Sequence, residues 1–242
     1  MTPFRVVVAD PAWKFGDKLP GKGRGAEKHY SVLDWEQICM LDLPPIADDA
    51  ILFLWRVAAM QTEALSVMHM WGFDPKSELV WVKTKDGVVI DEPVSEEELA
   101  FGMGRYTRHC HEVCLIGARG KAATQVVKNH SIRSVFFAER EEHSKKPDKF
   151  YSIVEELTGG EGPYLELFAR RRRTGWITLG DELGTKLTVL GDSHGSEDSN
   201  PDGSGDASAG GGSGVQAPAR RRAGGSKRAK AGAARAARQA SA

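Results

Sequence analysis

The segment Phe4-Arg5-Val6-Val7-Val8-Ala9-Asp10-Pro11-Ala12-Trp13 decides the fold. Its apolar first half, with three consecutive valines, predicts a buried strand. Proline cannot continue a β ladder, so we expect the chain to turn after Asp10. Because open α/β sheets bind ligands at the carboxyl ends of their strands, Asp10, Pro11 and Trp13 are expected at the rim of a site. A carboxylate, a rigid carbonyl and an indole suit a flat heterocycle that carries an amino group; the alternative is an Asp-Pro turn with a packing tryptophan.

Further strands and helices are predicted to alternate along residues 1–190. Apolar runs predict strands at 50–55, 79–82, 113–116, 135–137 and 164–168. The spacing of apolar residues predicts helices over 34–41, 57–71 and 147–157. Asp34 and Gln37 form a capping box at the start of the first helix, and Gly72 ends the second. This alternation predicts an α/β fold with a mostly parallel sheet and helices on both faces.

Two long polar segments, 14–30 and 84–110, interrupt this pattern beside the first and third strand ends. Segments of that length within a compact domain are typical of binding loops or lids. We therefore expect both of them to lie near the site.

The composition changes near Leu190, which predicts two regions. Residues 1–190 are expected to form the folded domain, whereas residues 191–242 have too few large apolar side chains to fold and are expected to be disordered. The formal net charge of zero hides a segregation, because residues 215–242 carry eight Lys/Arg and no acid. Such a basic end is typical of a tail that binds nucleic acid through phosphate charge, or of a solvated tail without a partner.

Several other protein classes find no support in the sequence. It has no apolar run of about 18 residues and no signal-peptide core, so neither a membrane span nor export is expected. Three cysteines fit a reducing cytoplasm. We expect no metal, because Cys110 and Cys114 would face away from His109 and His111 on a strand. The sequence also lacks a glycine-rich phosphate loop and a Gly-x-Ser-x-Gly elbow.

Two basic groups follow the later strands. Arg170-Arg171-Arg172-Arg173 comes after the strand at 164–168 and suits a phosphodiester backbone or a cofactor carboxylate, or is simply a solvated charge run. His143-Ser144-Lys145-Lys146 precedes a helix, where the helix dipole repels cations. An anionic partner or a flexible approach loop would explain that position.

Several blocks in a fixed order resemble a known family. They are Ala9–Trp13, Leu52–Trp55, Trp71–Phe73, Leu79–Thr84, His111–Gly117, His143–Pro147, Leu165–Arg170 and Gly175–Glu182. In these blocks the chain, over about residues 4–184, resembles the N6-adenine methyltransferases typified by the catalytic subunit of the eukaryotic mRNA N6-adenosine methyltransferase, the MT-A70 family, which also has bacterial and phage members. The resemblance implies a Rossmann-like domain dependent on S-adenosylmethionine, in which the catalytic tetrapeptide precedes the cofactor strand.

The resemblance also implies roles for individual residues. Asp10 and Pro11 would bind the adenine amino group, and Trp13 would stack on the base or wall it. Tyr30 falls where the family places an aromatic residue on the loop after the tetrapeptide, and would contact the substrate. Apart from the resemblance, the two basic groups make Lys145, Arg171 and Arg172 the candidates for contacts to the nucleic-acid substrate. Asp10, His111, Arg170, Asp181 and Glu182 would contact the cofactor, without a metal. Ala12 replaces the usual second proline of the tetrapeptide, and Arg171, Arg172 and Arg173 replace a different polar sequence.

The expected reaction is direct methyl transfer to the N6 amino group of adenine. DNA is favoured as the substrate, because the body lacks added RNA-binding domains and the tail is rich in Ala, Gly and Arg. RNA adenosine is the first alternative. A non-catalytic nucleic-acid-binding subunit of the same fold is the second, although such subunits typically lose the acidic residue that Asp10 supplies here. A partner subunit or a second copy of the chain stays open.

Overall fold

The computed structural model describes residues 2–14, 33–89, 94–104, 106–141, 145–185 and 187–190. The strands of this part are β1 (Phe4–Ala9), β2 (Ile46–Arg56), β3 (Asp74–Thr84), β4 (Gly102–Met103), β5 (Arg108–His109), β6 (His111–Arg119), β7 (Val135–Glu139), β8 (Tyr164–Leu167) and β9 (Trp176–Leu179). The helices are α1 (Trp35–Cys39), α2 (Gln61–Met70), α3 (Ala122–Gln125) and α4 (Asp148–Leu157), with 3₁₀ turns η2 (Ala58–Met60), η3 (Glu96–Glu98) and η4 (Asp181–Leu183). Tyr30 and the predicted tail at 191–242 lie outside the described residues.

A seven-stranded sheet forms the centre of the domain, with the strand order β7-β3-β6-β2-β1-β8-β9. β1 pairs in parallel with β2 and β8, β8 with β9, and β3 with β7. β6 runs antiparallel to both of its neighbours, β2 and β3. The predicted α/β fold with a mostly parallel sheet is therefore confirmed. Because β6 is reversed, its first residues lie at the edge where β1, β2 and β3 end.

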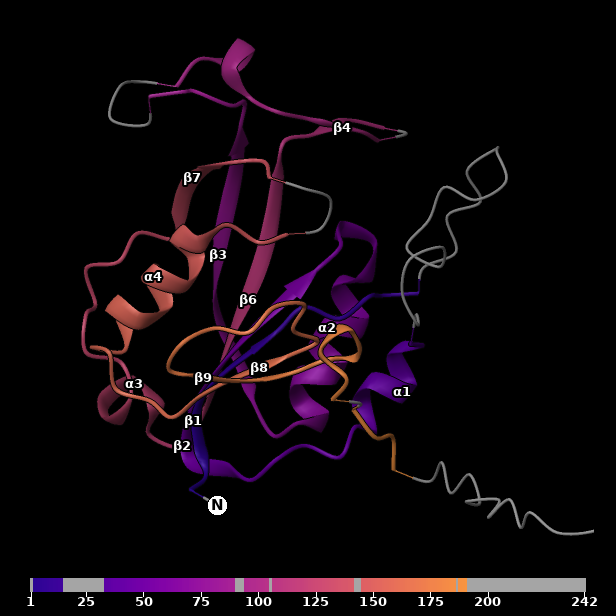
Figure 1. Cartoon of the computed structure of the whole chain (residues 1–242), viewed down its shortest axis with the longest axis vertical. Coiled ribbons are helices and arrows are strands. Elements are labelled where there is room, and N and C mark those ends of the chain that lie inside the picture. The colour runs from indigo at the N-terminus through magenta and orange to yellow at the C-terminus, as the bar shows by residue number, and fades with distance from the viewer. Residues whose placement is uncertain are drawn as a thin grey trace, which may run out of the picture. The chain divides into compact units, whose positions relative to one another are not determined.

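The helices cover both faces of this sheet (Figure 1). β2 shows how its side chains divide between the two layers: Leu52 and Leu54 belong to one apolar cluster, and Ile51 and Phe53 to the other. This alternation is the two-residue period of a strand that is buried on both faces. The first cluster includes residues of α1 and α2, and the second includes residues of α3 and α4, so we call these layers the α1/α2 face and the α3/α4 face.

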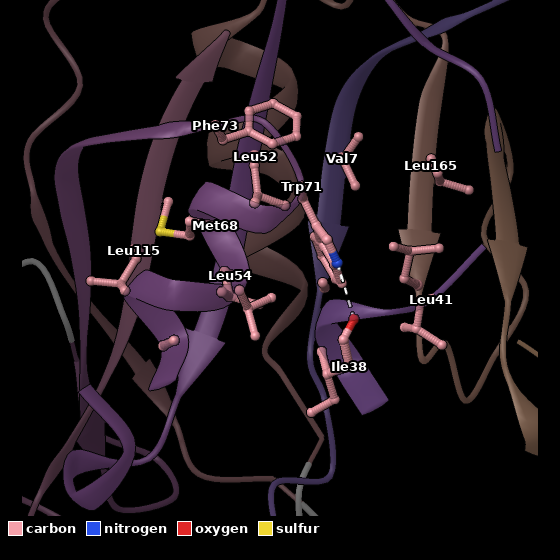
Figure 2. Packing of buried hydrophobic residues seen from close by; sticks show 14 of the residues in the cluster. Val7, Ile38, Leu41, Leu52, Leu54, Met68, Trp71, Phe73, Leu115 and Leu165 are labelled. Atoms are coloured by element: carbon pink, nitrogen blue, oxygen red, sulfur yellow. Dashed lines mark hydrogen bonds between the residues drawn. The ribbon is translucent and has the colours of Figure 1, made fainter. Parts of the chain in front are cut away.

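The α1/α2 face is packed almost wholly with aliphatic and aromatic side chains (Figure 2). Leu52 and Leu165 of the sheet belong to one apolar cluster with Met68 of α2 and Ile38 of α1. The indole N–H of Trp71 donates to the carbonyl oxygen of Ile38 over 3.0 Å, which joins the end of α2 to α1. Fully burying an aliphatic side chain such as Leu52 or Ile38 stabilises the fold by about 1.5–3 kcal/mol.

The two predicted helix-terminal motifs, the capping box before α1 and Gly72 after α2, are confirmed. The Asp34 N–H donates to Gln37 Oε1 over 3.0 Å in the capping box that begins α1. Gly72 ends α2 with a positive φ of 78°, the Gly72 N–H donates to the His69 carbonyl, and the Phe73 N–H donates to the Met68 carbonyl. This pair of bonds is a Schellman motif, which satisfies carbonyl groups at the helix end.

Other elements differ from the sequence prediction. The helix predicted over 34–41 ends at Cys39, and the helix predicted over 57–71 begins as the 3₁₀ turn η2 before it becomes α-helical at Gln61. β2 and β3 are longer than the apolar runs that predicted them, because each begins with a segment that contains polar residues and is not buried, partly exposed in β2 and mostly exposed in β3. Neither β9 nor α3 was predicted, since segments of four residues are too short to show a period.

The segment 84–110 leaves the sheet at the same edge as β1 ends. Its described part carries the small hairpin of β4 and β5, which projects from the ends of β3 and β6 (Figure 1). The Ala100 N–H donates to the Lys83 carbonyl, and the Lys83 N–H donates to the Cys110 carbonyl, so both sides of the projection are anchored on β3.

Candidate active site

Asp10 lies directly after β1, at the carboxyl edge of the sheet. Its Oδ2 atom is 2.7 Å from Lys146 Nζ, and Lys146 lies just before α4. The Lys146 side chain is only 8% exposed, and its ammonium group is 5.0 Å from the centre of the Trp55 ring. A buried ammonium held by a carboxylate and an aromatic face is fixed in position. Asp10 is thus presented by the strand end and oriented by Lys146.

The turn after Asp10 is closed by local hydrogen bonds. The Trp13 N–H donates to the Pro11 carbonyl over 2.9 Å, in the pattern of a γ-turn. The Trp13 indole N–H donates to the Trp55 carbonyl over 2.9 Å, and the side chain is 4% exposed. In this structure Trp13 packs beneath the turn and holds it against β2. Its stacking on a base stays a prediction, and would require the ring to leave this position.

Asp10 is one end of a chain of alternating charges. Glu112, on β6, has its Oε2 atom 3.3 Å from Lys146 Nζ. Its Oε1 atom is 2.5 Å from Lys83 Nζ, at the end of β3. Lys83, Glu112, Lys146 and Asp10, which we call the charge chain, therefore connect β3, β6 and β1 along the carboxyl edge of the sheet.

Burial and charge act in opposite directions on the middle of this chain. Burial disfavours the ionised carboxylate of Glu112, but the ammonium groups of Lys146 and Lys83 outweigh it and hold the pKa of Glu112 below its usual value. Burial likewise disfavours the charged form of Lys146, but Asp10 and Glu112 outweigh it and raise the pKa of Lys146. Both residues are therefore charged at neutral pH.

A second buried carboxyl group lies on β8, the neighbour of β1. Glu166 is paired with Val8 in the sheet register and is 7% exposed. Its Oε1 atom accepts a hydrogen bond of 2.6 Å from the Tyr151 hydroxyl, whereas its buried Oε2 atom has no hydrogen-bond partner among the described residues. Burial raises the pKa of Glu166, although the Tyr151 bond opposes that shift. An unpaired buried carboxylate oxygen is a site for a hydrogen-bond donor or a cation.

The arginine segment after β8 is folded onto α4. Arg171 and Arg173 both form ion pairs with Asp148, the first residue of α4. The Arg173 guanidinium also lies 3.5 Å from the centre of the Tyr151 ring. The hydrogen bond from Arg173 is the main cause that lowers the pKa of Asp148. Arg171 and Arg173 are therefore both held by one carboxylate of the chain itself.

A close backbone approach brings the two ends of the β8–β9 connection together. A Cβ atom at Gly180 would lie 2.1 Å from the Ala169 carbonyl oxygen, so only glycine fits there. Phe168 has a φ of 62°, which is strained for a bulky residue and turns the chain sharply after β8. In consequence Arg170 lies beside η4, and its Nε atom is 3.7 Å from Glu182 Oε1.

The remaining predicted residues are spread along this edge. His111 is exposed and precedes Glu112 on β6, so the alternation of the strand directs the two side chains to opposite faces. Lys145 pairs with Glu141, and Arg172 is exposed. Asp181 and Glu182 are exposed on η4. The structure thus groups Asp10 with Pro11, and Arg170 with Glu182, but it does not bring His111 into the charge chain.

Three central residues of the site were not singled out from the sequence, namely Lys83, Glu112 and Glu166, and Lys146 was noted only as a member of the basic group before the helix. Each is a charged residue in or beside an apolar strand or helix start, which is an informative anomaly because such residues are rarely buried without a partner. The position of Lys146 before α4 is unusual for a cation, and Asp10 and Glu112 are the anions that explain it.

The described residues carry neither a metal signal nor a membrane signal. They contain no group of three or more His, Cys, Asp or Glu side chains arranged to hold a metal ion. The three cysteines are free thiols, and burial raises the pKa of Cys114 well above its usual value. No helix in this part of the chain is both long and apolar enough to cross a membrane.

An α/β domain that gathers an Asp-Pro turn and buried charges at the ends of its strands has the architecture of a ligand-binding enzyme domain. Residues 4–182 match the MT-A70 family, and the chain belongs to that family. It is 31% identical over 183 residues to the human N(6)-adenosine-methyltransferase catalytic subunit METTL3, covering 74% of this chain and 28% of METTL3. It is 26% identical over 200 residues to the type II methyltransferase M.MunI of Mycoplasma sp., covering 74% of this chain and 78% of M.MunI.

The chain thus spans less than a third of the length of the METTL3 proteins that it matches, including that of Danio rerio at 31% identity. Its match to M.MunI, in contrast, covers most of both chains. The family resemblance expected from the sequence blocks is confirmed.

Proposed function

We propose that the protein is an S-adenosylmethionine-dependent methyltransferase that methylates the N6 amino group of adenine in DNA. The observation that carries this proposal is the presentation of Asp10 at the end of β1, held by Lys146 over 2.7 Å beside the Pro11 carbonyl. Membership of the MT-A70 family and the similarity to proteins named as adenosine methyltransferases support it.

The adenine amino nitrogen is a weak nucleophile, because its lone pair is delocalised into the ring. In the proposed reaction, the Asp10 carboxylate accepts one amino hydrogen and the Pro11 carbonyl accepts the other. The Pro11 oxygen already accepts the Trp13 N–H, and its second lone pair serves the substrate. Two acceptors at fixed positions favour a pyramidal nitrogen, and orienting the reactants accounts for about 7–11 kcal/mol of the barrier. The nitrogen gives up one of these protons, toward Asp10, as its new bond to carbon forms.

The residues along the same edge fit the cofactor. The unpartnered buried Oε2 atom of Glu166 suits the ammonium group of its amino-acid end, which would remove the cost of about 1–3 kcal/mol for an unpaired buried acceptor. Arg170, Asp181 and Glu182 lie together at the β8–β9 connection, where they would meet the ribose and adenine. When bound, S-adenosylmethionine supplies an electrophilic methyl group on a sulfonium, whose sulfur departs as a neutral thioether.

The choice of DNA is supported by the type II methyltransferase M.MunI, because that match covers most of both chains. The METTL3 proteins, named for adenosine, support RNA as the alternative substrate. In duplex DNA the target base must be extruded, at a cost of a few kcal/mol. Arg172, which is exposed beside this edge, is proposed to offset part of that cost through phosphate contacts, together with Tyr30, Lys145 and Arg171.

The test is methyl transfer from labelled S-adenosylmethionine to duplex DNA, single-stranded DNA and RNA, offered separately, with the nucleosides analysed by mass spectrometry. We expect N6-methyladenine in DNA from the wild type and a loss of at least about 10³-fold with Asp10→Ala, as when a preorganised catalytic group is removed. Cofactor binding should remain measurable in that variant.

Asp74→Asn is the matched control, because Asp74 is an exposed aspartate at the opposite end of β3. Methylation of RNA alone would replace DNA in the proposal. Transfer by Asp10→Ala at the wild-type rate would refute the assignment of Asp10, and no transfer to any polymer would refute the activity.

We also propose that residues 1–190 are the methyltransferase domain and that the basic end of 191–242 adds phosphate contacts. Replacing the eight Lys/Arg of residues 215–242 by Gln in the full chain should then flatten the dependence of DNA affinity on salt. An unchanged slope would assign the tail no such role.

A further inference from the structure

Lys83 is the outermost member of the charge chain, and it has no place in the reaction as proposed above. Its side chain is 17% exposed, and its ammonium group lies 2.5 Å from Glu112 Oε1 and 5.1 Å from the centre of the Trp81 ring. A lysine that served only solubility would be exposed, because partial burial of its charge carries a desolvation cost. Lys85, two residues further on, shows the contrast, since it is exposed and donates to the Glu97 carbonyl.

The arrangement makes Lys146 the shared partner of two carboxylates. Its Nζ atom is 2.7 Å from Asp10 and 3.3 Å from Glu112, so it lies closer to Asp10. Lys83 occupies the other oxygen of Glu112 and neutralises part of its charge. With all four residues charged, the chain sums to zero. Without Lys83, two carboxylates would compete for one ammonium group, and Glu112 would draw it away from Asp10.

We propose that Lys83 is a positioning residue for methyl transfer, which holds Glu112 so that Lys146 stays on Asp10 and fixes the oxygen that accepts the amino hydrogen. The proposal rests on the proposed function, because it takes Asp10 as the acceptor. The effect passes through two intermediate side chains from β3 to the end of β1, across the strands that the sheet order places between them.

The charge on Lys83 is separable from its packing. Lys83→Met keeps an apolar stem of similar length against Trp81 but removes the ammonium group. Lys83→Arg keeps the charge, and Lys85→Met is the matched control on the exposed lysine. Glu112→Gln removes the carboxylate through which Lys83 is proposed to act.

The experiment measures kcat and KM for these variants and for Lys83→Met/Glu112→Gln on the polymer that the wild type methylates. We expect Lys83→Met to lower kcat about tenfold with KM changed less than twofold, as for a small misplacement of a reacting group. Lys83→Arg should recover most of kcat, and Lys85→Met should match the wild type. In the double variant, the neutral amide introduced by Glu112→Gln does not compete for Lys146. Adding Lys83→Met to Glu112→Gln should therefore change kcat less than about twofold.

The pH dependence gives a readout that a purely structural role would not move. Lys83 is one of two ammonium groups that lower the pKa of Glu112, so the acid limb of the kcat profile should move to higher pH in Lys83→Met. Besides Lys83, the titratable and charged groups that act on Glu112 or on its partner Lys146 are Lys146 itself, Asp10 and Cys114. Tyr151 and Glu166 interact with Asp10 at the far end of the charge chain, and Arg173 interacts with those two. They are unchanged in both Lys83→Met and Lys85→Met, and only the former should shift the limb.

Multiplicative losses in the double variant, or a Lys83→Met protein that loses stability while its folded fraction keeps the wild-type kcat and pH profile, would overturn the proposal. If Lys83→Met does not fold, Lys83→Gln is used in the same comparison. A wild type that methylates no polymer refutes the proposed function and the role of Lys83 with it, whereas an active wild type with an unaltered Lys83→Met refutes the role of Lys83 alone.

Discussion

The two faces of the sheet differ in chemistry, although the same strands supply both. On the α1/α2 face, residues such as Val7, Leu52 and Leu165 form a cluster of apolar side chains. On the α3/α4 face, the same strands place Glu166 and, beyond β1, Asp10 among aromatic rings and cations. One residue of offset along a strand therefore separates a position that only packs from a position that carries charge.

Aromatic residues on the α3/α4 face contact the buried charges and reduce the cost of burying them. Trp55 packs edge-to-face on Trp81 and Phe150, and the two tryptophan rings lie under the ammonium groups of Lys83 and Lys146. Ring faces attract cations, so the two rings and the neighbouring carboxylates together hold the ammonium groups in place. Both faces bury apolar side chains and stabilise the fold, and the α3/α4 face in addition carries the buried charges of the site.

Leu52→Ala should therefore have the largest effect on stability and none on chemistry. Leu52 is fully buried in the middle of β2, and a truncation of this kind costs about 2–5 kcal/mol. The free energy of unfolding is measured in urea, and kcat is normalised to folded protein. Met70→Ala is the control, because Met70 on α2 is 62% exposed. A fall in kcat of the folded protein would show that the two faces are not independent.

Tyr151→Phe probes the polar face and should depend on pH. Burial raises the pKa of Glu166 in the folded state, so this carboxyl stabilises the fold fully below its usual pKa and loses that contribution as the pH rises through the folded value. The Tyr151 hydrogen bond opposes the shift. Removing it should cost about 1–3 kcal/mol at pH 8 and less at pH 4, because a hydroxyl donates a stronger hydrogen bond to an ionised carboxylate than to a protonated one.

Tyr164→Phe is the matched control for this measurement. The Tyr164 hydroxyl shares a hydrogen bond of 2.7 Å with Thr158 Oγ1, a partner that does not titrate. Its loss should be the same at both pH values. Equal losses at the two pH values for Tyr151→Phe would show that Glu166 does not change its charge in this range.

The sequence predicted the sheet well, because β1, β2 and β8 are buried on both faces and therefore appear as unbroken apolar runs. It also predicted Asp10 at a strand end, since proline must end the ladder. The contacts between residues far apart in the sequence were not predicted. Lys146 reaches Asp10 across 136 positions, and neither residue carries a local signal of the other.

The charge chain could not be predicted from the sequence because the antiparallel direction of β6 was not known. An apolar run does not reveal in which direction a strand enters the sheet, and only the reversed β6 places Glu112 at the edge with Lys83. His111, adjacent in sequence, is on the other side of the strand from the charge chain because successive side chains of a strand alternate between its two faces. The residue adjacent to a motif is thus a poor guide to the residues that complete its site.

Two tryptophans of the α1/α2 face allow a test of which buried residues affect only stability and which also affect catalysis. Trp13 and Trp71 belong to the same cluster, and each donates its indole N–H to a backbone carbonyl, of Trp55 over 2.9 Å and of Ile38 over 3.0 Å. Replacing either by Phe should cost about 1 kcal/mol for the lost hydrogen bond. Only Trp13 lies beneath the turn that presents Pro11, so only Trp13→Phe should also lower kcat.

The difference in kcat between Trp13→Phe and Trp71→Phe tests what decides whether a buried residue affects catalysis: the face of the sheet on which it lies, or its position along the strands. If the division follows the faces of the sheet, both variants will keep the wild-type kcat per folded molecule. If it follows position along the strands, Trp13→Phe will lower kcat about tenfold, since a small displacement of an acceptor is costly in methyl transfer. We expect the second result, because the Trp13 indole N–H is bonded to the Trp55 carbonyl of β2, and its loss would free the turn whose Pro11 carbonyl is proposed to accept the amino hydrogen. Equal kcat values in the two variants would show that the Trp13 indole does not position the turn, and that the Asp10–Lys146 ion pair is sufficient to hold it.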